Sequence, residues 1–303
     1  MKNLIPLMQR EWLQHRFGWM LMALIPIGLA LALTTFGSIQ IDDETLAKVG
    51  NELAARAALI AIAGTMAVMF LIGWISSLII VSGLARRDHG DRSIEFWMSL
   101  PSSHSESIAA PLIVHLLLVP MASLLVGLAG GWLLSLVAVS RVAGFGAWLT
   151  LPWPELLLGT GSLTLRLIAG LPLAELWLLP LTMLIILLTA WFRRWGWVIL
   201  GVGIGLGSQL LERVFGQPLL AQWLSGVFKH AVHAMVSSQR GFVVDGPRDI
   251  AGALGAFPAW VLHDLGLAFA DLVSPLLAGG LLFAAGCFAL LVMWRQRGAG
   301  VAG

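Results

Sequence analysis

Charged residues are scarce in this chain. Of its 303 residues, 11% are Asp, Glu, Lys or Arg and 58% are hydrophobic, and the mean hydropathy is +0.90. A soluble domain carries about 25% charged residues, so this composition excludes an ordinary soluble domain and indicates an integral membrane protein. The net charge of +2 is too small to indicate binding to nucleic acid.

Residues that several common chemistries need are also missing. The single cysteine, Cys287, excludes an internal disulfide. None of the lysines (Lys2, Lys48 and Lys229) follows a glycine, which excludes the Gly-Lys-Ser/Thr end of a nucleotide-binding phosphate loop. A Gly-x-Ser-x-Gly nucleophile motif is absent as well. We therefore predict that the chain is not an enzyme and carries no cofactor or metal of its own.

Long apolar runs dominate what remains. A helix that crosses a bilayer needs about 20 mostly apolar residues. Six segments satisfy this requirement or come close to it: 17–39, 57–84, 108–140, 171–192, 195–211 and 272–294. We therefore predict an all-α polytopic membrane protein, with residues 1–303 forming one transmembrane domain of six helices.

The positions of arginine and lysine predict the orientation of these helices in the membrane. If the N-terminus lies inside, the inner segments hold ten basic residues against five acidic ones. Basic residues are enriched on the cytoplasmic side of membrane proteins. The pattern therefore places both termini in the cytoplasm.

Two further segments are semi-apolar. Residues 1–16 alternate apolar and charged side chains, which predicts an amphipathic helix in the membrane surface. Residues 212–271, on the outer side, contain two such pieces, 219–236 and 250–270. Histidines, a lysine and an aspartate interrupt these pieces, so we predict interfacial or re-entrant helices. Two additional spans are the alternative, and they would leave the C-terminus on the same side.

Histidines and glycines offer few candidate sites. His230 and His233 are three residues apart, and His263-Asp264 follows, but we interpret them as interfacial polar residues rather than a metal site. His115, without an obvious partner, is the ionisable residue that we expect nearest to membrane depth. Four glycines alternate through Gly201–Gly207, which predicts close helix packing, with a bendable helix as the alternative.

Residues 85–107, between the second and third predicted spans, interrupt the apolar pattern. Asp91 can cap a short helix that Pro101 ends. Ser103 and Glu106 have the spacing of a capping box that starts a second helix into the third span. The first helix is amphipathic, with Arg92 and Glu95 polar and with these apolar residues on or beside one face: Ile94, Phe96, Trp97, Met98 and Leu100. We predict a stiff amphipathic bracket on the cytoplasmic surface that is suited to receive force from a docked soluble subunit, and an ordinary loop with a surface helix is the alternative.

These stretches carry a resemblance to a known family. The segment Ser93-Ile94-Glu95-Phe96-Trp97-Met98-Ser99-Leu100-Pro101-Ser102-Ser103, together with Arg10-Glu11-Trp12, resembles the ABC-2 (type V) transporter permeases. Their coupling helix lies between the second and third spans, and its stretch commonly reads glycine, two residues, glutamate, and then Leu-Pro-x-Ser. Here Ser93 stands where glycine is usual, and Ala110-Pro111 stand where a lysine often opens the third span.

The resemblance implies a function. It suggests the permease subunit of an ATP-driven exporter in the inner membrane, a homodimer with its transport path between the two copies. A separate ATPase subunit would bind Mg-ATP. Residues implied in coupling to that partner are Asp91, Arg92, Ile94, Glu95, Phe96, Trp97, Leu100 and Pro101, with secondary contacts from Glu11 and Arg16.

The sequence does not identify the cargo. The scarcity of charged residues at membrane depth suits an amphipathic or lipid-like molecule, and helices that only pack against one another are the alternative reason for this composition. Three alternatives belong to other classes. They are an ion-coupled secondary transporter, a non-transporting scaffold or immunity protein, and an intramembrane enzyme.

Overall fold

The computed structural model describes residues 4–38, 52–90, 104–236 and 250–300. Over these residues the chain is helical and contains no strand, which confirms the all-α prediction. The main helices are α1 (Leu4–Phe36), α3 (Leu53–Gly90), α5 (His104–Ile113), α6 (Val119–Ala143), α8 (Trp153–Phe192), α9 (Gly196–Phe215), α10 (Leu219–Met235), α11 (Ile250–Ala270) and α12 (Pro275–Gly300). Short turns fill the gaps: a π-helical turn at Val114–Leu118, α7 (Phe145–Leu149) and a 3₁₀ turn at Arg193–Trp195.

Six stretches of the described residues are long and apolar enough to cross a membrane: 4–36, 53–84, 105–143, 153–215, 250–270 and 275–294. The protein is therefore a multi-pass helical membrane protein. The sequence also predicted six spans, but the six predicted segments are not the six stretches found in the structure. The predicted spans 171–192 and 195–211 both fall within the stretch 153–215, and α11 takes the remaining place. The interfacial or re-entrant placement of α11 stays a prediction.

Helix α8 begins earlier than its sequence indicates. The sequence from Arg141 to Gly170 is half apolar and contains Pro152-Trp153-Pro154, which predicts an interfacial excursion before the span 171–192. The structure has a 40-residue helix from Trp153 instead. Proline is tolerated in the first turn of a helix, where its missing N–H has no partner to lose. The Pro152 carbonyl accepts a hydrogen bond from the Leu156 N–H at 3.0 Å, which is the first hydrogen bond of the helix.

Helix α1 runs without interruption through residues that we assigned to two elements. The predicted surface leader, 1–16, and the predicted first span, 17–39, share one helix of 33 residues. Its first half nevertheless differs in environment, because Leu7 and Glu11 are its buried residues. Whether the leader lies in the membrane surface stays a prediction.

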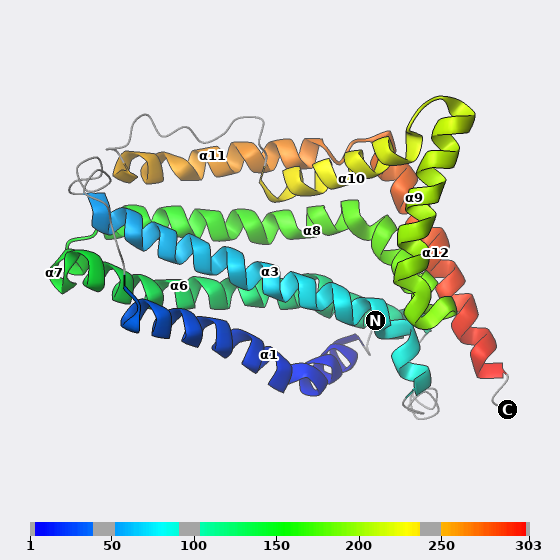
Figure 1. Ribbon diagram of the computed structural model, residues 1–303, viewed down its shortest axis with the longest axis horizontal. Helices are drawn as coiled ribbons and strands as arrows, with labels where there is room; N and C mark the ends of the chain where they lie inside the picture. Colours follow the sequence, from blue (N-terminus) through cyan, green and yellow to red (C-terminus); the bar gives the residue numbers. More distant parts are fainter. Residues whose placement is uncertain (1–3, 39–51, 91–103, 237–249, 301–303) are drawn as a thin grey trace.

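The helices have two directions (Figure 1). Helices α1, α3, α6, α8 and α11 run along the long axis, whereas α9 and α12 cross them at one end. The start of α1, the end of α3 and the end of α12 all lie at that end (Figure 1). The end of α1, the start of α3 and α7 lie at the opposite end. This arrangement puts the first and last described residues at the end of the bundle where α3 ends.

Glycines allow a close contact between α3 and α6. A Cβ on Gly131 would lie 2.8 Å from the Ile62 Cα, and one on Gly127 would lie 2.9 Å from the Met66 Cα. Two glycines four residues apart therefore let the backbones touch. The predicted packing role of Gly201–Gly207 is not seen at three of its four glycines within this chain. A Cβ at Gly201, Gly203 or Gly205 would meet nothing within 4 Å, whereas one on Gly207 would lie 3.5 Å from Cδ2 of Leu220.

Two matched substitutions test this packing. Gly131→Ala should destabilise the protein by about 1–3 kcal/mol, because the added methyl group overlaps the Ile62 backbone. Gly203→Ala should be neutral or slightly stabilising, because it faces open space and alanine favours helix. Thermal unfolding of the two variants in the same detergent measures the difference. Equal unfolding temperatures would contradict the assigned packing.

Candidate functional site

The third candidate span contains an irregular turn. Residues Val114–Leu118 form a π-helical turn between α5 and α6. Pro120 follows within the first turn of α6 and has no N–H to donate to the Leu116 carbonyl. A π-helical turn relieves such a mismatch, and these turns occur frequently at functional sites. Here the turn carries His115, whose side chain is fully buried.

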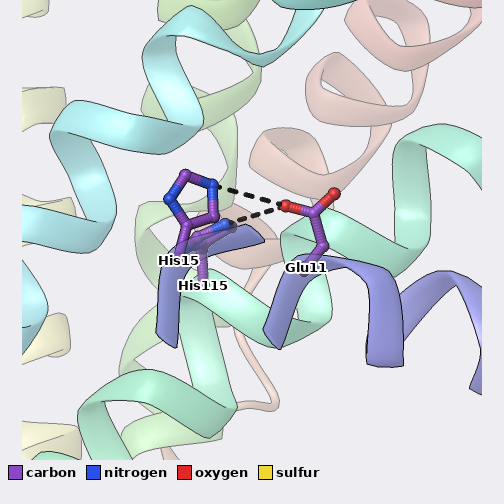
Figure 2. A group of neighbouring side chains, drawn as sticks. All are labelled: Glu11, His15 and His115. Carbon is purple, nitrogen blue, oxygen red and sulfur yellow. Dashed lines mark hydrogen bonds and ion pairs between the residues drawn. The ribbon is translucent and has the colours of Figure 1, made fainter. Parts of the chain in front are cut away.

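His115 faces helix α1 (Figure 2). Its Nε2 atom lies 3.3 Å from Oε2 of Glu11, and the Glu11 side chain is 1% exposed. The same carboxylate oxygen lies 3.9 Å from Nε2 of His15, one turn further along α1. Two imidazole nitrogens from different helices therefore converge on one carboxylate oxygen. We call Glu11, His15 and His115 the histidine–carboxylate cluster.

Aromatic rings enclose the cluster. The ring of Trp19 lies 5.7 Å from that of His115 and 5.8 Å from that of His15, between centroids. Trp12 packs against Trp19 at 5.4 Å. Among the described residues, Nε1 of Trp19 and Nδ1 of His115 are buried without a hydrogen-bond partner. A buried carboxylate in such surroundings is costly unless it is paired, so its contact with the histidines is a requirement of the fold.

The cluster has the composition of a metal site. One ligand atom from each of its three side chains lies within 4.8 Å of the others. Two imidazoles and a carboxylate are a ligand set found in zinc sites. Sequence reasoning missed the cluster, because 104 residues separate Glu11 from His115 and no local pattern links them. The spacing of Glu11 and His15 by four residues was the available signal.

A pocket of about 320 Å³ lies beside the cluster, between α1 and the third candidate span. Trp12 and Trp19 belong to both features. Apart from Ser123, its lining is apolar and includes Met8, Met20, Met22, Met69, Leu118 and Val126. The surface of the pocket is therefore suited to an apolar group next to a polar end.

The residues predicted to couple to a partner are only partly described. Asp91, Arg92, Ile94, Glu95, Phe96, Trp97, Leu100 and Pro101 lie outside the described residues. Glu11 points inward, toward His115. Arg16 is exposed, with its guanidinium carbon 5.1 Å from the centre of the Phe17 ring. The coupling roles of Glu11 and Arg16 stay predictions. Helix α5 begins at His104, with Glu106 in its first turn, close to the predicted start of the second helix.

A second buried polar site joins three helices. Arg166 of α8 is fully buried, and its Nε donates to Oδ2 of Asp264 in α11 at 2.8 Å. Its other nitrogens donate to the carbonyls of Ala234 at 2.7 Å and His233 at 3.3 Å. Both carbonyls belong to the last turn of α10, where carbonyls lack partners inside the helix. One guanidinium therefore neutralises an aspartate and caps a neighbouring helix.

The remaining histidines do not gather at one point. His230 stacks on Trp177 with 4.3 Å between ring centroids, and its Nδ1 lies 3.5 Å from Asp271. Asp264, which we had considered beside the histidines, pairs with Arg166. The residues considered as a weak metal site therefore do not form one site. His230 contacts Trp177 and Asp271, whereas Asp264 pairs with Arg166.

Our expectation that His115 is the nearest ionisable residue to membrane depth was incomplete. Glu175 lies inside the predicted fourth span and is buried. Its Oε1 accepts a hydrogen bond at 2.7 Å from Nε1 of Trp74 in α3. Arg166 and Asp264 are likewise buried in helices of the bundle. Their partners come from distant parts of the chain, so no local sequence pattern shows which group pairs with each of these side chains.

The fold and these sites define a multi-pass helical membrane protein whose buried polar groups pair between helices. Comparison of the chain with protein-family models, curated protein sequences and solved structures finds no match.

Removing one partner of the Arg166–Asp264 pair should be strongly destabilising. Arg166→Ala leaves a buried carboxylate and two helix-end carbonyls without their donor, and should cost about 3–5 kcal/mol of unfolding free energy. Arg141→Ala is the matched control, because Arg141 is exposed and bonds only the Gly37 carbonyl among the described residues. It should cost less than about 1 kcal/mol.

Denaturant titration in mixed micelles measures both variants. The double variant Arg166→Met/Asp264→Leu, which removes both charges, should recover much of the loss. A loss for Arg166→Ala no larger than that for Arg141→Ala would contradict the assigned role of the pair.

Proposed function

We propose that this chain is the membrane-spanning permease subunit of an ATP-binding cassette exporter of the ABC-2 type. In this proposal it forms a homodimer in the inner membrane, with both termini in the cytoplasm. A separate ATPase subunit docks on residues 85–107 and supplies the energy. The absence of a phosphate-binding lysine motif from the chain supports an external source of energy.

The observation that carries the proposal is the packing of α1 against α5. Helix α1 contains residues 10–16, and α5 begins at His104, directly after residues 93–103. Residues 10–16 and 93–103 are the stretches that carry the resemblance to ABC-2 permeases. The contact between Glu11 and His115 lies in this junction. The start of α1 and the end of α3 lie at the same end of the bundle (Figure 1).

The packing offers a route for mechanical coupling. Residues 104–143 form one continuous helical stretch that begins where the predicted coupling helix ends. Its α6 part packs along α3 through Gly127 and Gly131. A partner that displaces the α3–α5 connection would therefore move two long, tightly packed helices together. To shift the population between two states, the partner must bind one of them better by a few kcal/mol.

The pocket beside α1 supports an amphipathic or lipid-like substrate. Its lining is apolar, and the histidine–carboxylate cluster supplies a polar group next to it. Such a pair of environments suits a molecule with an apolar body and a polar end. Identification of a co-purified ligand by mass spectrometry would test this part of the proposal separately.

An ion-coupled secondary transporter is the second candidate. The buried Glu175, the Arg166–Asp264 pair and the Glu11–His115 contact favour it, because ionisable residues within membrane helices often mark ion or proton pathways. Transport driven by an ion gradient in vesicles without an ATPase would support this candidate and contradict the first.

Paired substitutions in the coupling segment test the main proposal. Glu95→Lys together with Trp97→Ala should abolish co-purification of the ATPase subunit, since the pair removes an anchoring ring and reverses a charge at the docking surface. The candidate partner to co-express is any P-loop ATPase that an adjacent open reading frame encodes. Pull-down from detergent-solubilised membranes measures its recovery.

Glu212→Lys with Phe215→Ala is the matched control. Both side chains are exposed near the end of α9, in the segment that we predict to lie on the outer side. This variant should recover the ATPase at the wild-type level, and both variants should insert in the membrane. Unchanged recovery with the Glu95/Trp97 variant would defeat the assignment.

A further inference from the structure

We propose that Glu11, His15 and His115 bind a divalent transition metal ion of the zinc class, and that this ion joins α1 to the third candidate span. The inference rests on the geometry of the cluster (Figure 2) and does not depend on the proposed transport function. It assigns a binding site to residues that sequence reasoning did not connect.

The distances fit a common coordination sphere. Zinc binds imidazole nitrogen at about 2.0–2.1 Å and carboxylate oxygen at about 2.0–2.2 Å, usually in a tetrahedron. Ligand atoms in such a tetrahedron lie about 3.3–3.6 Å apart. Oε2 of Glu11 lies 3.3 Å from Nε2 of His115 and 3.9 Å from Nε2 of His15. The edge between Glu11 and His15 would reach this range after a movement of a few tenths of an ångström, and all three ligand atoms lie within 4.8 Å of one another.

The local structure positions each ligand. Glu11 and His15 are separated by four residues and therefore occupy one face of α1. His115 approaches from a different element, the π-helical turn, so the three ligands surround a common point instead of lying in a row (Figure 2). His15 is 25% exposed, whereas the other two ligands are buried, and this leaves a side from which an ion can enter.

The chemistry of the ligands selects the metal class. Imidazole nitrogens favour zinc, copper and nickel, whereas magnesium and calcium prefer oxygen ligands. A divalent cation would offset the buried carboxylate of Glu11 without a protonated histidine. Three protein ligands leave a fourth position open, as in zinc sites that bind water or another ligand.

Zinc binding by the full chain tests the proposal. The purified protein in detergent is stripped with EDTA, incubated with Zn²⁺ and desalted, and the bound metal is measured by mass spectrometry. The expected result is about one zinc per chain, together with a rise in the unfolding temperature that EDTA reverses. Co²⁺ in place of Zn²⁺ should give the visible absorption of a tetrahedral site.

Two ligand variants and one control locate the bound ion. His115→Gln and His15→Gln should each weaken zinc binding by at least about tenfold, as the loss of a direct ligand exceeds the usual effect of an outer partner. His15 is partly exposed, so His15→Gln remains informative if His115→Gln does not fold. His230→Gln, at the contact with Trp177 and Asp271, should bind zinc like the wild type.

Three results would overturn the proposed zinc site. A wild-type protein that retains no zinc after desalting and shows no shift in unfolding temperature would overturn the proposal. Full zinc binding by folded His15→Gln would do the same, as would loss of binding in His230→Gln alone. None of these results depends on an ATPase partner, so failure here is distinguishable from failure of the proposed function.

Discussion

Pairing of buried charges between helices is the constraint on which the rest of this structure depends. In an apolar bundle, an isolated charge costs far more than any single packing contact contributes. Arg166 therefore joins α8 to α11 and to the end of α10, and Glu11 joins α1 to the π-helical turn. Glu175 of α8 accepts a hydrogen bond from the neutral indole of Trp74 in α3. These polar contacts select which of the helices they join are neighbours, and glycine packing does so for α3 and α6.

The two buried pairs lie in parts of the bundle to which we assign different roles. The Arg166 site lies among α8, α10 and α11, and it holds together helices that we predicted on the outer side. The histidine–carboxylate cluster lies in the junction between α1 and the helices α5 and α6, which follow the predicted coupling segment. In the proposed exporter, the Arg166–Asp264 site is a rigid support. The histidine–carboxylate cluster lies close to the helices that the ATPase would move. A metal ion in the cluster would make that junction stiffer.

Much of the helical layout could be predicted from the sequence, because length and hydropathy determine it. The bounds of α10 and α11 agree closely with the predicted pieces 219–236 and 250–270, and α5 begins near the predicted capping box. The start of α8 was missed because Pro152 and Pro154 can open a helix as well as break a span. The packing glycines were misplaced because Gly127 and Gly131 have the same spacing as Gly201 and Gly205, and only tertiary structure distinguishes them. The candidate site depends on contacts between distant residues, which local patterns do not encode.

The central claim is that residues 85–107 face the cytoplasm and receive work from a partner there. The chain suits a direct test, because its single cysteine, Cys287, is 4% exposed and can be replaced by alanine. In that background, Trp97→Cys is treated in intact cells with a membrane-impermeant thiol reagent, and again after permeabilisation. The account predicts labelling only after permeabilisation. Labelling of position 97 in intact cells would place the segment on the outer side and contradict the account.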